Sequence, residues 1–207
     1  EQEMTLLFSD IRDFTTLSES ILPAENFRFI NSYLSTMAPV VAKHAGIIDK
    51  YIGDGIMALF PGSADDGVRS GIDMLNQLTL YNNGRTRAGY MPIRIGIGLN
   101  TGLVMMGTVG GHNRMDSTVI GDAVNLASRL EATNKTFGSR IICSAATQHE
   151  APDVANAERS QIPIRGKAGE VEILVVRGPF GQPPRDLEWG HGDLAIDWDR
   201  AATRGYR

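Results

Sequence analysis

The sequence of 207 residues lacks several features that would place it in a specialised class of protein. Its single cysteine, Cys143, excludes an internal disulfide, and without a cysteine and histidine cluster a structural zinc site is not expected. No apolar run approaches the roughly 18 residues of a membrane span, and the start, EQEMTLLFSD, does not form a signal peptide. These absences predict a soluble domain in a reducing compartment, the cytoplasm. The expectation concerns this domain and is compatible with a full-length protein that is attached to a membrane.

An excess of positive charge is missing too. The chain has 20 basic and 24 acidic residues and a net charge of -4, so it has no general attraction to nucleic acid or to an anionic membrane. No Walker A motif occurs, and the glycines of GIGLNTG (96–102) do not match G-x-G-x-x-G. P-loop and Rossmann sites are therefore excluded, and any polyanion must be bound by local cations.

What the sequence does contain predicts an α+β fold, an α/β sandwich. A hydrophobic content of 42% fits one or at most two globular domains. Alternating or β-branched runs predict strands at 4–9, 46–51, 55–60, 93–99, 103–109, 140–143 and 171–176. Apolar spacings of three and four predict helices that start after Pro23, over about 65–80 and over about 120–133. This order predicts a β-α-β-β-α-β core with additions, with helices on one face of a mainly antiparallel sheet.

Several details of this prediction can be tested. The first helix should bury a stripe made of Phe27, Ile30, Leu34, Met37 and Val41, and Pro39 should bend or end it. The polar stretches 81–92 and 107–117 are expected to be loops. Residues 1–177 form the folded domain, and 178–207, rich in Gly, Pro and charge, form a tail that is draped over the domain, partly mobile or a docking arm. Because the chain begins almost directly in a strand-like run, we expect a domain cut from a longer protein.

Two carboxylates stand at turns next to predicted strands. Asp10 ends the first strand in LLFSDIRDFT and is followed by amides and small hydroxyls that could face a phosphate. Asp54 lies at the tip of the Gly-Asp-Gly turn in IIDKYIGDGIMALF (47–60), and Lys50 lies in the strand before it. If the first strand and this hairpin are neighbours, Asp10 and Asp54 meet at one edge, where Mg²⁺ with substrate phosphates would relieve their repulsion. Each carboxylate alone could equally belong to a solvated turn or a helix start.

Cations and an amide occur in two further motifs. In STVIGDAVNLASRLEA, Asn125 and Arg129 are four residues apart and therefore share one face of a helix. A guanidinium beside an amide suits a phosphoryl group and a sugar, although an ordinary exposed helix face shows the same pattern. Arg165 and Lys167 lie in a Gly-containing turn of IPIRGKAGEVEILVV, which alone is a weak signal.

Four stretches in order, FSDIRDFT, DKYIGDGIMALF, TVIGDAVNLASRLEA and RGKAGEVEI, resemble the signature blocks of class III nucleotidyl cyclases, the adenylyl and guanylyl cyclase catalytic domain, in their bacterial form. The resemblance covers residues 4–177. It implies a ferredoxin-like core with additional strands and a dimerisation arm, for which 107–117 is the candidate. It also implies a head-to-tail homodimer with two active sites shared between the subunits, and a fusion to a sensor or regulatory domain in the full-length protein.

The resemblance assigns roles to individual residues. Two divalent metal ions, Mg²⁺ or Mn²⁺, are implied on Asp10, Asp54 and the backbone carbonyl of Ile11. The other matched positions are Arg129 for the transition state, Asn125 for the ribose, Lys167 for the terminal phosphates, Lys50 and Thr118 for the purine, and Phe14 and Thr15 in the substrate-binding turn after the first aspartate. Arg12 and Asp13 stand where the family often has glycine, which makes Arg12 a candidate for an additional phosphate contact.

Lys50 favours ATP over GTP. A lysine only donates hydrogen bonds, so it suits adenine N1, an acceptor, and not guanine N1, which carries a hydrogen. The mismatch is worth on the order of 1 to 3 kcal/mol. Thr118 can donate or accept and does not discriminate strongly. The expected reaction is therefore ATP to 3′,5′-cyclic AMP and pyrophosphate; the alternatives are a guanylyl or mixed-purine cyclase and a catalytically silent nucleotide-binding or dimerisation module.

Overall fold

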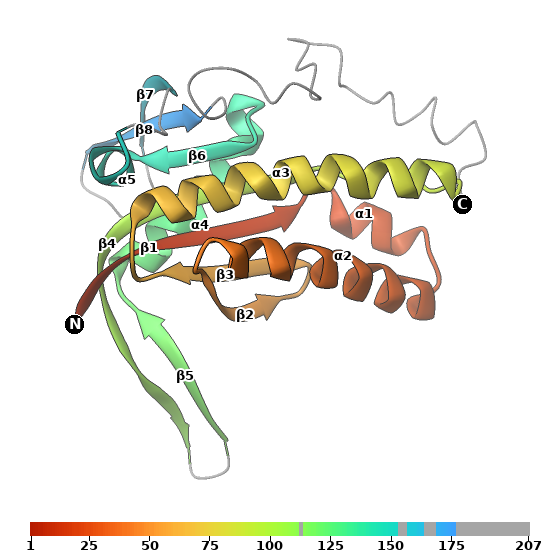
Figure 1. Cartoon of the computed structure of the whole chain (residues 1–207), viewed down its shortest axis with the longest axis horizontal. Helices are drawn as coiled ribbons and strands as arrows, with labels where there is room; N and C mark the ends of the chain where they lie inside the picture. The colour runs from red at the N-terminus through yellow and green to blue at the C-terminus, as the bar shows by residue number, and fades with distance from the viewer. Residues whose placement is uncertain (112–113, 153–156, 164–168, 177–207) are drawn as a thin grey trace.

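The computed structural model describes residues 1–111, 114–152, 157–163 and 169–176, which fold around a central sheet (Figure 1). The strands are β1 (Gln2–Ile11), β2 (Ile47–Ile52), β3 (Gly55–Phe60), β4 (Ile95–Gly111), β5 (Arg114–Ile120), β6 (Ile141–Ser144), β7 (Ala157–Pro163) and β8 (Glu170–Val176). The helices are α1 (Phe14–Glu19), α2 (Pro23–Lys43), α3 (Ala64–Arg87), α4 (Asp122–Phe137) and α5 (Ala145–Glu150). Across these ranges, no helix combines the length and the apolar character needed to cross a membrane.

The sheet has the strand order β2-β3-β1-β4-β6-β8-β7, and β5 pairs with β4 outside this path. Its first four strands, with α2 and α3, have the β-α-β-β-α-β connectivity of a ferredoxin-like fold. Within the described part of the chain, the pairings are antiparallel except that of β4 with β6, which is parallel. The predicted α+β class and ferredoxin-like core are confirmed, while α1, α5, β5 and β7 were not predicted.

Helices cover both faces of the sheet, which corrects the expectation of one helical face. Leu7 of β1 packs in the core beneath α2 and α3, the two helices in front of the sheet in Figure 1. Its neighbour Leu6 points to the other face, because successive side chains of a strand alternate, and packs with Ala127 of α4. Gly98 of β4 lets α4 come close, since a Cβ there would overlap the backbone nitrogen of Glu131. This close packing places α4 directly on the central strands.

The buried face of α2 differs in part from the predicted stripe. It consists of Phe29, Tyr33, Leu34, Met37 and Val41, with Ile30 partly buried. Phe27 is 71% exposed, because the four-residue spacing that starts at Phe29 leaves it beyond the edge of the stripe. Pro39 does not end the helix, which continues to Lys43.

Part of the loop expected over 81–92 is helical, because α3 continues to Arg87. The side-chain amide of Asn82 pairs with the backbone of Ile93 through two hydrogen bonds of 2.8 Å. Arg85 donates to the carbonyl of Met91 at 2.7 Å, and its guanidinium lies 4.4 Å from the centre of the Phe29 ring. The polar side chains that indicated a loop therefore fasten the end of the helix to the chain that follows it.

β4 is one strand where two were expected, at 93–99 and 103–109. Its residues 95–104 pair with β1, and residues 105–111 pair with β5 to form a hairpin that projects from the body of the domain (Figure 1). We call residues 105–120 the arm. Most of the loop expected over 107–117 is thus strand. β4 and β5 pair through backbone hydrogen bonds, which do not require apolar side chains packed in a core. The tail predicted over 178–207 lies outside the described residues.

Candidate active site

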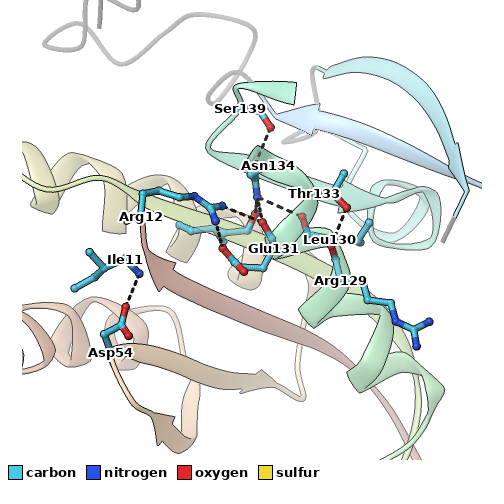
Figure 2. Close-up of polar contacts among 10 residues, drawn as sticks. Ile11, Arg12, Asp54, Arg129, Leu130, Glu131, Thr133, Asn134 and Ser139 are labelled. Atoms are coloured by element: carbon cyan, nitrogen blue, oxygen red, sulfur yellow. Dashed lines mark hydrogen bonds and ion pairs between the residues drawn. The ribbon is translucent and has the colours of Figure 1, made fainter. Parts of the chain in front are cut away.

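The end of β1 and the turn between β2 and β3 bring Asp10 and Asp54 together, as the sequence predicts. β1 and β3 are antiparallel, with Ser9 opposite Ile56, so the end of β1 lies beside the start of β3. Asp54 Oδ2 accepts a hydrogen bond from the backbone N–H of Ile11 at 3.1 Å (Figure 2). A Cβ at Gly55 would lie 3.0 Å from the Ser9 carbonyl oxygen. A glycine after Asp54 therefore allows the turn to approach β1 this closely.

The titration of Asp54 depends on its neighbour Asp10. Partial burial, a hydrogen bond with Asp10 and the charge of Asp10 raise the pKa of Asp54 to about 7, and the N–H of Ile11 opposes that rise. Two carboxyl groups within hydrogen-bond reach share a proton readily but repel each other when both are ionised. A divalent cation would remove this repulsion, and carboxylate and carbonyl oxygens are the donors that Mg²⁺ prefers. The residues present therefore fit a divalent metal site.

Lys50 and Thr118, the two residues matched to the purine positions, also meet. Lys50 Nζ of β2 donates to Thr118 Oγ1 of β5 at 2.8 Å. Asp49 is not among the predicted site residues, yet its Oδ2 accepts from Thr118 Oγ1 at 3.0 Å and lies 3.2 Å from Lys50 Nζ. The Asp49 side chain is only 6% exposed. A charged residue in a strand pattern gives no sign that it will be buried in this way.

Asn125 and Arg129 lie on α4, outside its buried face. Asn125 is exposed and Arg129 half-buried, four residues apart on the helix as predicted. The Arg129 side chain points away from the side on which Asp54 and Arg12 lie (Figure 2). The structure therefore does not bring Arg129 to the carboxylate pair of its own chain.

The arrangement agrees with a comparison to known families. The family model described as the adenylate and guanylate cyclase catalytic domain matches residues 1–178. The chain belongs to this family.

Its relatives include two proteins named as adenylate cyclases. The cyclase domain is 47% identical over 146 residues to an adenylate cyclase of Anabaena cylindrica, covering 68% of this chain and 29% of that protein. It is 41% identical over 185 residues to the terminal-differentiation specific adenylate cyclase of Dictyostelium discoideum, covering 84% of this chain and 9% of that protein. The chain thus spans less than a third of either relative.

Solved structures agree with the fold. The guanylyl cyclase Cya2 superposes with a TM-score of 0.78 and 34% identity, covering 90% of this chain and 96% of that one. The adenylyl cyclase CyaB from P. aeruginosa gives 0.76 and 35%, covering 90% and 97%. Overall similarity therefore does not distinguish ATP from GTP as the substrate, and the choice depends on individual residues.

The turn after Asp10 departs from expectation at Arg12. Its guanidinium points inward, where Nη1 lies 2.8 Å from Glu131 Oε1 and Nη2 donates to the Glu131 carbonyl at 2.9 Å (Figure 2). The two side chains are 10% and 11% exposed, so Arg12 is not the additional phosphate contact that the sequence suggested. Asp13 adopts a φ of 58°, a conformation that glycine, often found at this turn in the cyclase family, reaches more easily.

The structure describes two of the other predicted binding residues, Phe14 and Thr15. The Phe14 ring stacks on Phe29, with centroids 6.3 Å apart, so its backbone rather than its side chain is available to a substrate. Thr15 is exposed in the first turn of α1. Arg165 and Lys167 lie outside the described residues.

A first prediction concerns metal binding to the cyclase domain. The pKa of Asp54 is higher in the folded state than its ordinary value of 3.8, so the folded state binds more protons and the metal-free domain loses stability as pH rises toward 7. A divalent cation replaces the proton. Mn²⁺ is therefore expected to raise the melting temperature more near pH 8 than near pH 6, because protons compete with the metal.

Thermal unfolding with and without Mn²⁺ at the two pH values tests this prediction. Asp54→Asn should lose most of the metal-dependent shift. Asp73→Asn is the control, because Asp73 binds Lys43 and His44 through its side chain and lies away from the turn. A metal-dependent shift that is equal at both pH values, or that survives in Asp54→Asn, would contradict the assignment.

Proposed function

We propose that this domain is an adenylyl cyclase that converts ATP to 3′,5′-cyclic AMP and pyrophosphate at the interface of a homodimer in the cytoplasm. The observation that carries the proposal is the meeting of Asp10 and Asp54 at one sheet edge, in a family of nucleotidyl cyclases. The chain spans less than a third of the Anabaena cylindrica relative and of the Dictyostelium discoideum relative. We therefore also propose that it is one part of a longer regulated protein.

The reaction joins the ribose 3′-oxygen to the α-phosphorus and breaks the bond from the α-phosphorus to the oxygen that leaves with pyrophosphate. The proton of the 3′-hydroxyl is released to solvent, so the products are cyclic AMP, pyrophosphate and one proton. Asp10, Asp54 and the Ile11 carbonyl would hold the two divalent metal ions, Mg²⁺ or Mn²⁺, which supply charge neutralisation and an activated 3′-oxygen. The Ile11 N–H fixes the Asp54 carboxylate through the 3.1 Å hydrogen bond, so the ligand is oriented before substrate binds.

Residues that carry no metal would orient the substrate and stabilise its charge. Arg129 presents a guanidinium to the α-phosphoryl oxygens as negative charge builds there, and Asn125 on the same helix face binds the ribose. The N–H groups of Phe14 and Thr15, in the first turn of α1, have no helical carbonyl before them and are free to face the phosphates. Lys167 is assigned to the terminal phosphates by its match to the family.

A homodimer is supported by exposed apolar side chains in two places. Some lie on the edge strand β2, and the others lie on β4 and β5 near the base of the arm. These side chains are Ile47, Tyr51, Ile52, Leu103, Met105, Met106 and Ile120. Exposed apolar surface of this kind marks contacts between proteins, and an unpaired edge strand is a surface that proteins cover. In a two-fold dimer the arm and α4 of one subunit would complete the site that begins at the carboxylate pair of the other.

The experiment that tests the function is a competition between the two purines. The purified dimeric domain is incubated with Mg²⁺ or Mn²⁺ and equal amounts of ATP and GTP, and the products are identified by mass spectrometry. Predominantly cyclic AMP is expected. Predominantly cyclic GMP would support the guanylyl cyclase alternative, for which the likeness to Cya2 is the relevant observation. No cyclic product from a confirmed dimer would favour a silent regulatory module.

A further inference from the structure

We infer that Asp49 sharpens the purine selectivity of this site by fixing the Thr118 hydroxyl as a hydrogen-bond acceptor. The inference rests on the proposed function, because it concerns how the same site distinguishes ATP from GTP. Asp49 would act through Thr118 and Lys50 and is therefore a positioning residue.

Asp49 reaches Thr118 because β2 is irregular at this point. In a regular strand, residues 49 and 50 would point to opposite faces of the sheet. The pairing of β2 with β3 shifts between Ile48, opposite Ala58, and Lys50, opposite Met57, which leaves Asp49 as an extra residue. Such a bulge redirects side chains. It allows two consecutive residues of β2 to contact one hydroxyl on β5.

The hydrogen atoms of the cluster determine what each group can offer to a base. A threonine hydroxyl has one hydrogen and two lone pairs, while a carboxylate has only acceptors. The hydroxyl hydrogen of Thr118 is donated to Asp49 Oδ2, and one lone pair accepts from Lys50 Nζ. The remaining lone pair is the group that Thr118 can present to a ligand. Without Asp49 the same hydroxyl could rotate and donate.

Lys50 is restricted in the same way. Its ammonium has three N–H groups; one goes to Thr118 at 2.8 Å, and a second faces Asp49 Oδ2 at 3.2 Å. The third remains for the base. The buried carboxylate thus holds the ammonium beside the hydroxyl, and the cluster offers one donor and one acceptor.

That pattern matches adenine and opposes guanine at two positions. Adenine N1 accepts from Lys50, and its N6 amino group donates to Thr118. Guanine would place its N1–H against the ammonium and its O6 against the fixed acceptor. An unmatched pair of acceptors in a desolvated site costs free energy comparable to a lost hydrogen bond. Asp49 therefore adds to a selectivity that Lys50 alone would only partly provide.

The test compares Asp49→Ala with Asp49→Asn by measuring kcat/KM for ATP and for GTP. Alanine removes the acceptor and frees the Thr118 hydroxyl to donate to guanine O6. We expect the ratio of the ATP value to the GTP value to fall by about tenfold, the effect of one hydrogen-bond mismatch. Asparagine keeps an oxygen at the place of Oδ2, which accepts both bonds, and is expected to keep most of the ratio.

The controls separate this mechanism from a structural role. A general loss of structure lowers both values and leaves their ratio unchanged. In a Thr118→Val background, Asp49→Ala should change the ratio much less than in the wild type, because the hydroxyl that Asp49 orients is missing and only its contact with Lys50 remains. Asp73→Asn removes a carboxylate that also binds a lysine, Lys43 at 2.7 Å, and should leave the ratio as it is.

The outcomes also separate this inference from the proposed function. An unchanged ratio in Asp49→Ala, with cyclic AMP still formed, would overturn the inference and leave the adenylyl cyclase standing. An equal fall in the alanine and asparagine variants would overturn it too, because the charge rather than the acceptor would then matter. If the wild-type dimer formed no cyclic nucleotide, both would fail. Should Asp49→Ala not fold, Thr118→Val must itself lower the ratio for the inference to survive.

Discussion

Two inactive variants of this domain, Asp54→Ala and Arg129→Ala, are expected to recover activity when they are mixed. Each alone should lose activity on the order of 10³-fold or more, because one lacks a proposed metal ligand and the other lacks the cation proposed to stabilise the transferring phosphoryl group. In a heterodimer, the chain with intact Asp54 supplies the carboxylates and the chain with intact Arg129 supplies the guanidinium. Random pairing gives one intact site in half of the dimers, so about a quarter of wild-type activity is the upper limit.

The structural reason is the direction of the side chains. Asp54 is held to Ile11 at the end of β1, while Arg129 leaves α4 toward the other side (Figure 2). A single chain therefore carries two half-sites that face apart. Activity is measured as cyclic AMP formed over a series of mixing ratios, with heterodimer formation checked through two different affinity tags.

A mixture of Asp54→Ala with Asp10→Ala is the matched control. Both variants lack a carboxylate of the same half-site, so every site in their heterodimer is missing one metal ligand and no recovery is expected. Recovery in both mixtures would show that subunit exchange or residual activity, and not a shared site, explains the result. No recovery from Asp54→Ala with Arg129→Ala in a confirmed heterodimer would refute the shared site.

The carboxylate pair could be predicted because the residues next to Asp10 and Asp54 in the sequence indicate the strand end and the turn in which they lie. Asp10 follows an alternating strand, and Asp54 lies between two glycines in a hairpin, so the strand order alone was enough to place them at one edge. The ferredoxin-like core was predictable for the same reason, since each strand and helix carries its own apolar period. Predictions that rest on one element and its immediate neighbours were largely confirmed.

The positions that sequence reasoning missed depend on contacts between distant segments. Asp49 is directed toward Thr118 by a bulge that strand periodicity does not reveal. Arg12 is drawn inward by Glu131, 119 residues later in the chain, and passes a position, Gly96, where any Cβ would overlap its guanidinium. Charged side chains are usually exposed. Only a partner from another element makes their burial favourable.

The arm was misjudged for a different reason. A stretch rich in glycine and polar residues does not read as a strand when strands are expected to contribute a face to the core. Apart from Val119, which is buried in the core at the base of the arm, the two strands of the arm project from the core and pair with each other, from Met105 opposite Ile120 to Gly111 opposite Arg114. Its role at a dimer interface stays a prediction, which the mixing experiment tests indirectly.

The buried ion pair between Arg12 and Glu131 leads to a second large effect, on stability. Arg12→Met is expected to lower the free energy of unfolding by about 3 to 5 kcal/mol near pH 8, because Glu131 loses its partner and must either stay charged in a buried position or take up a proton far above its ordinary pKa of 4.5. A domain of this kind is stable by about 5 to 15 kcal/mol. The loss is therefore a large fraction of the total, and urea denaturation of the dimer at fixed protein concentration would measure it.

The pH dependence identifies the cause. Burial raises the pKa of Glu131 to about 7, against an ordinary value of 4.5, and the Arg12 guanidinium opposes that rise. Without Arg12 the pKa of Glu131 rises further, so the folded state binds more protons than the unfolded state between the two values, and stability falls as pH increases. The defect of Arg12→Met should thus be smaller near pH 5, where Glu131 takes up a proton, than near pH 8.

A second arginine and glutamate pair provides the control. Arg159 Nη1 lies 2.9 Å from Glu172 Oε1, almost the same distance as the 2.8 Å of the buried pair, but these side chains are 63% and 38% exposed. Arg159→Met should cost less than about 1 kcal/mol and show little dependence on pH. Equal losses in the two arginine variants would mean that burial of the Arg12 pair does not determine its effect.

The Arg12–Glu131 ion pair joins the end of β1 to α4, the two elements that carry the proposed catalytic residues. Arg12 follows the end of β1 that is proposed to bind metal, and Glu131 lies two residues after Arg129 on α4. Arg12→Met/Glu131→Leu removes both charges and is expected to recover most of the lost stability, because neither ion is left unpaired. If this double variant is stable and yet forms cyclic AMP slowly, the pair positions β1 against α4 for catalysis; if it is stable and fully active, its role is confined to folding.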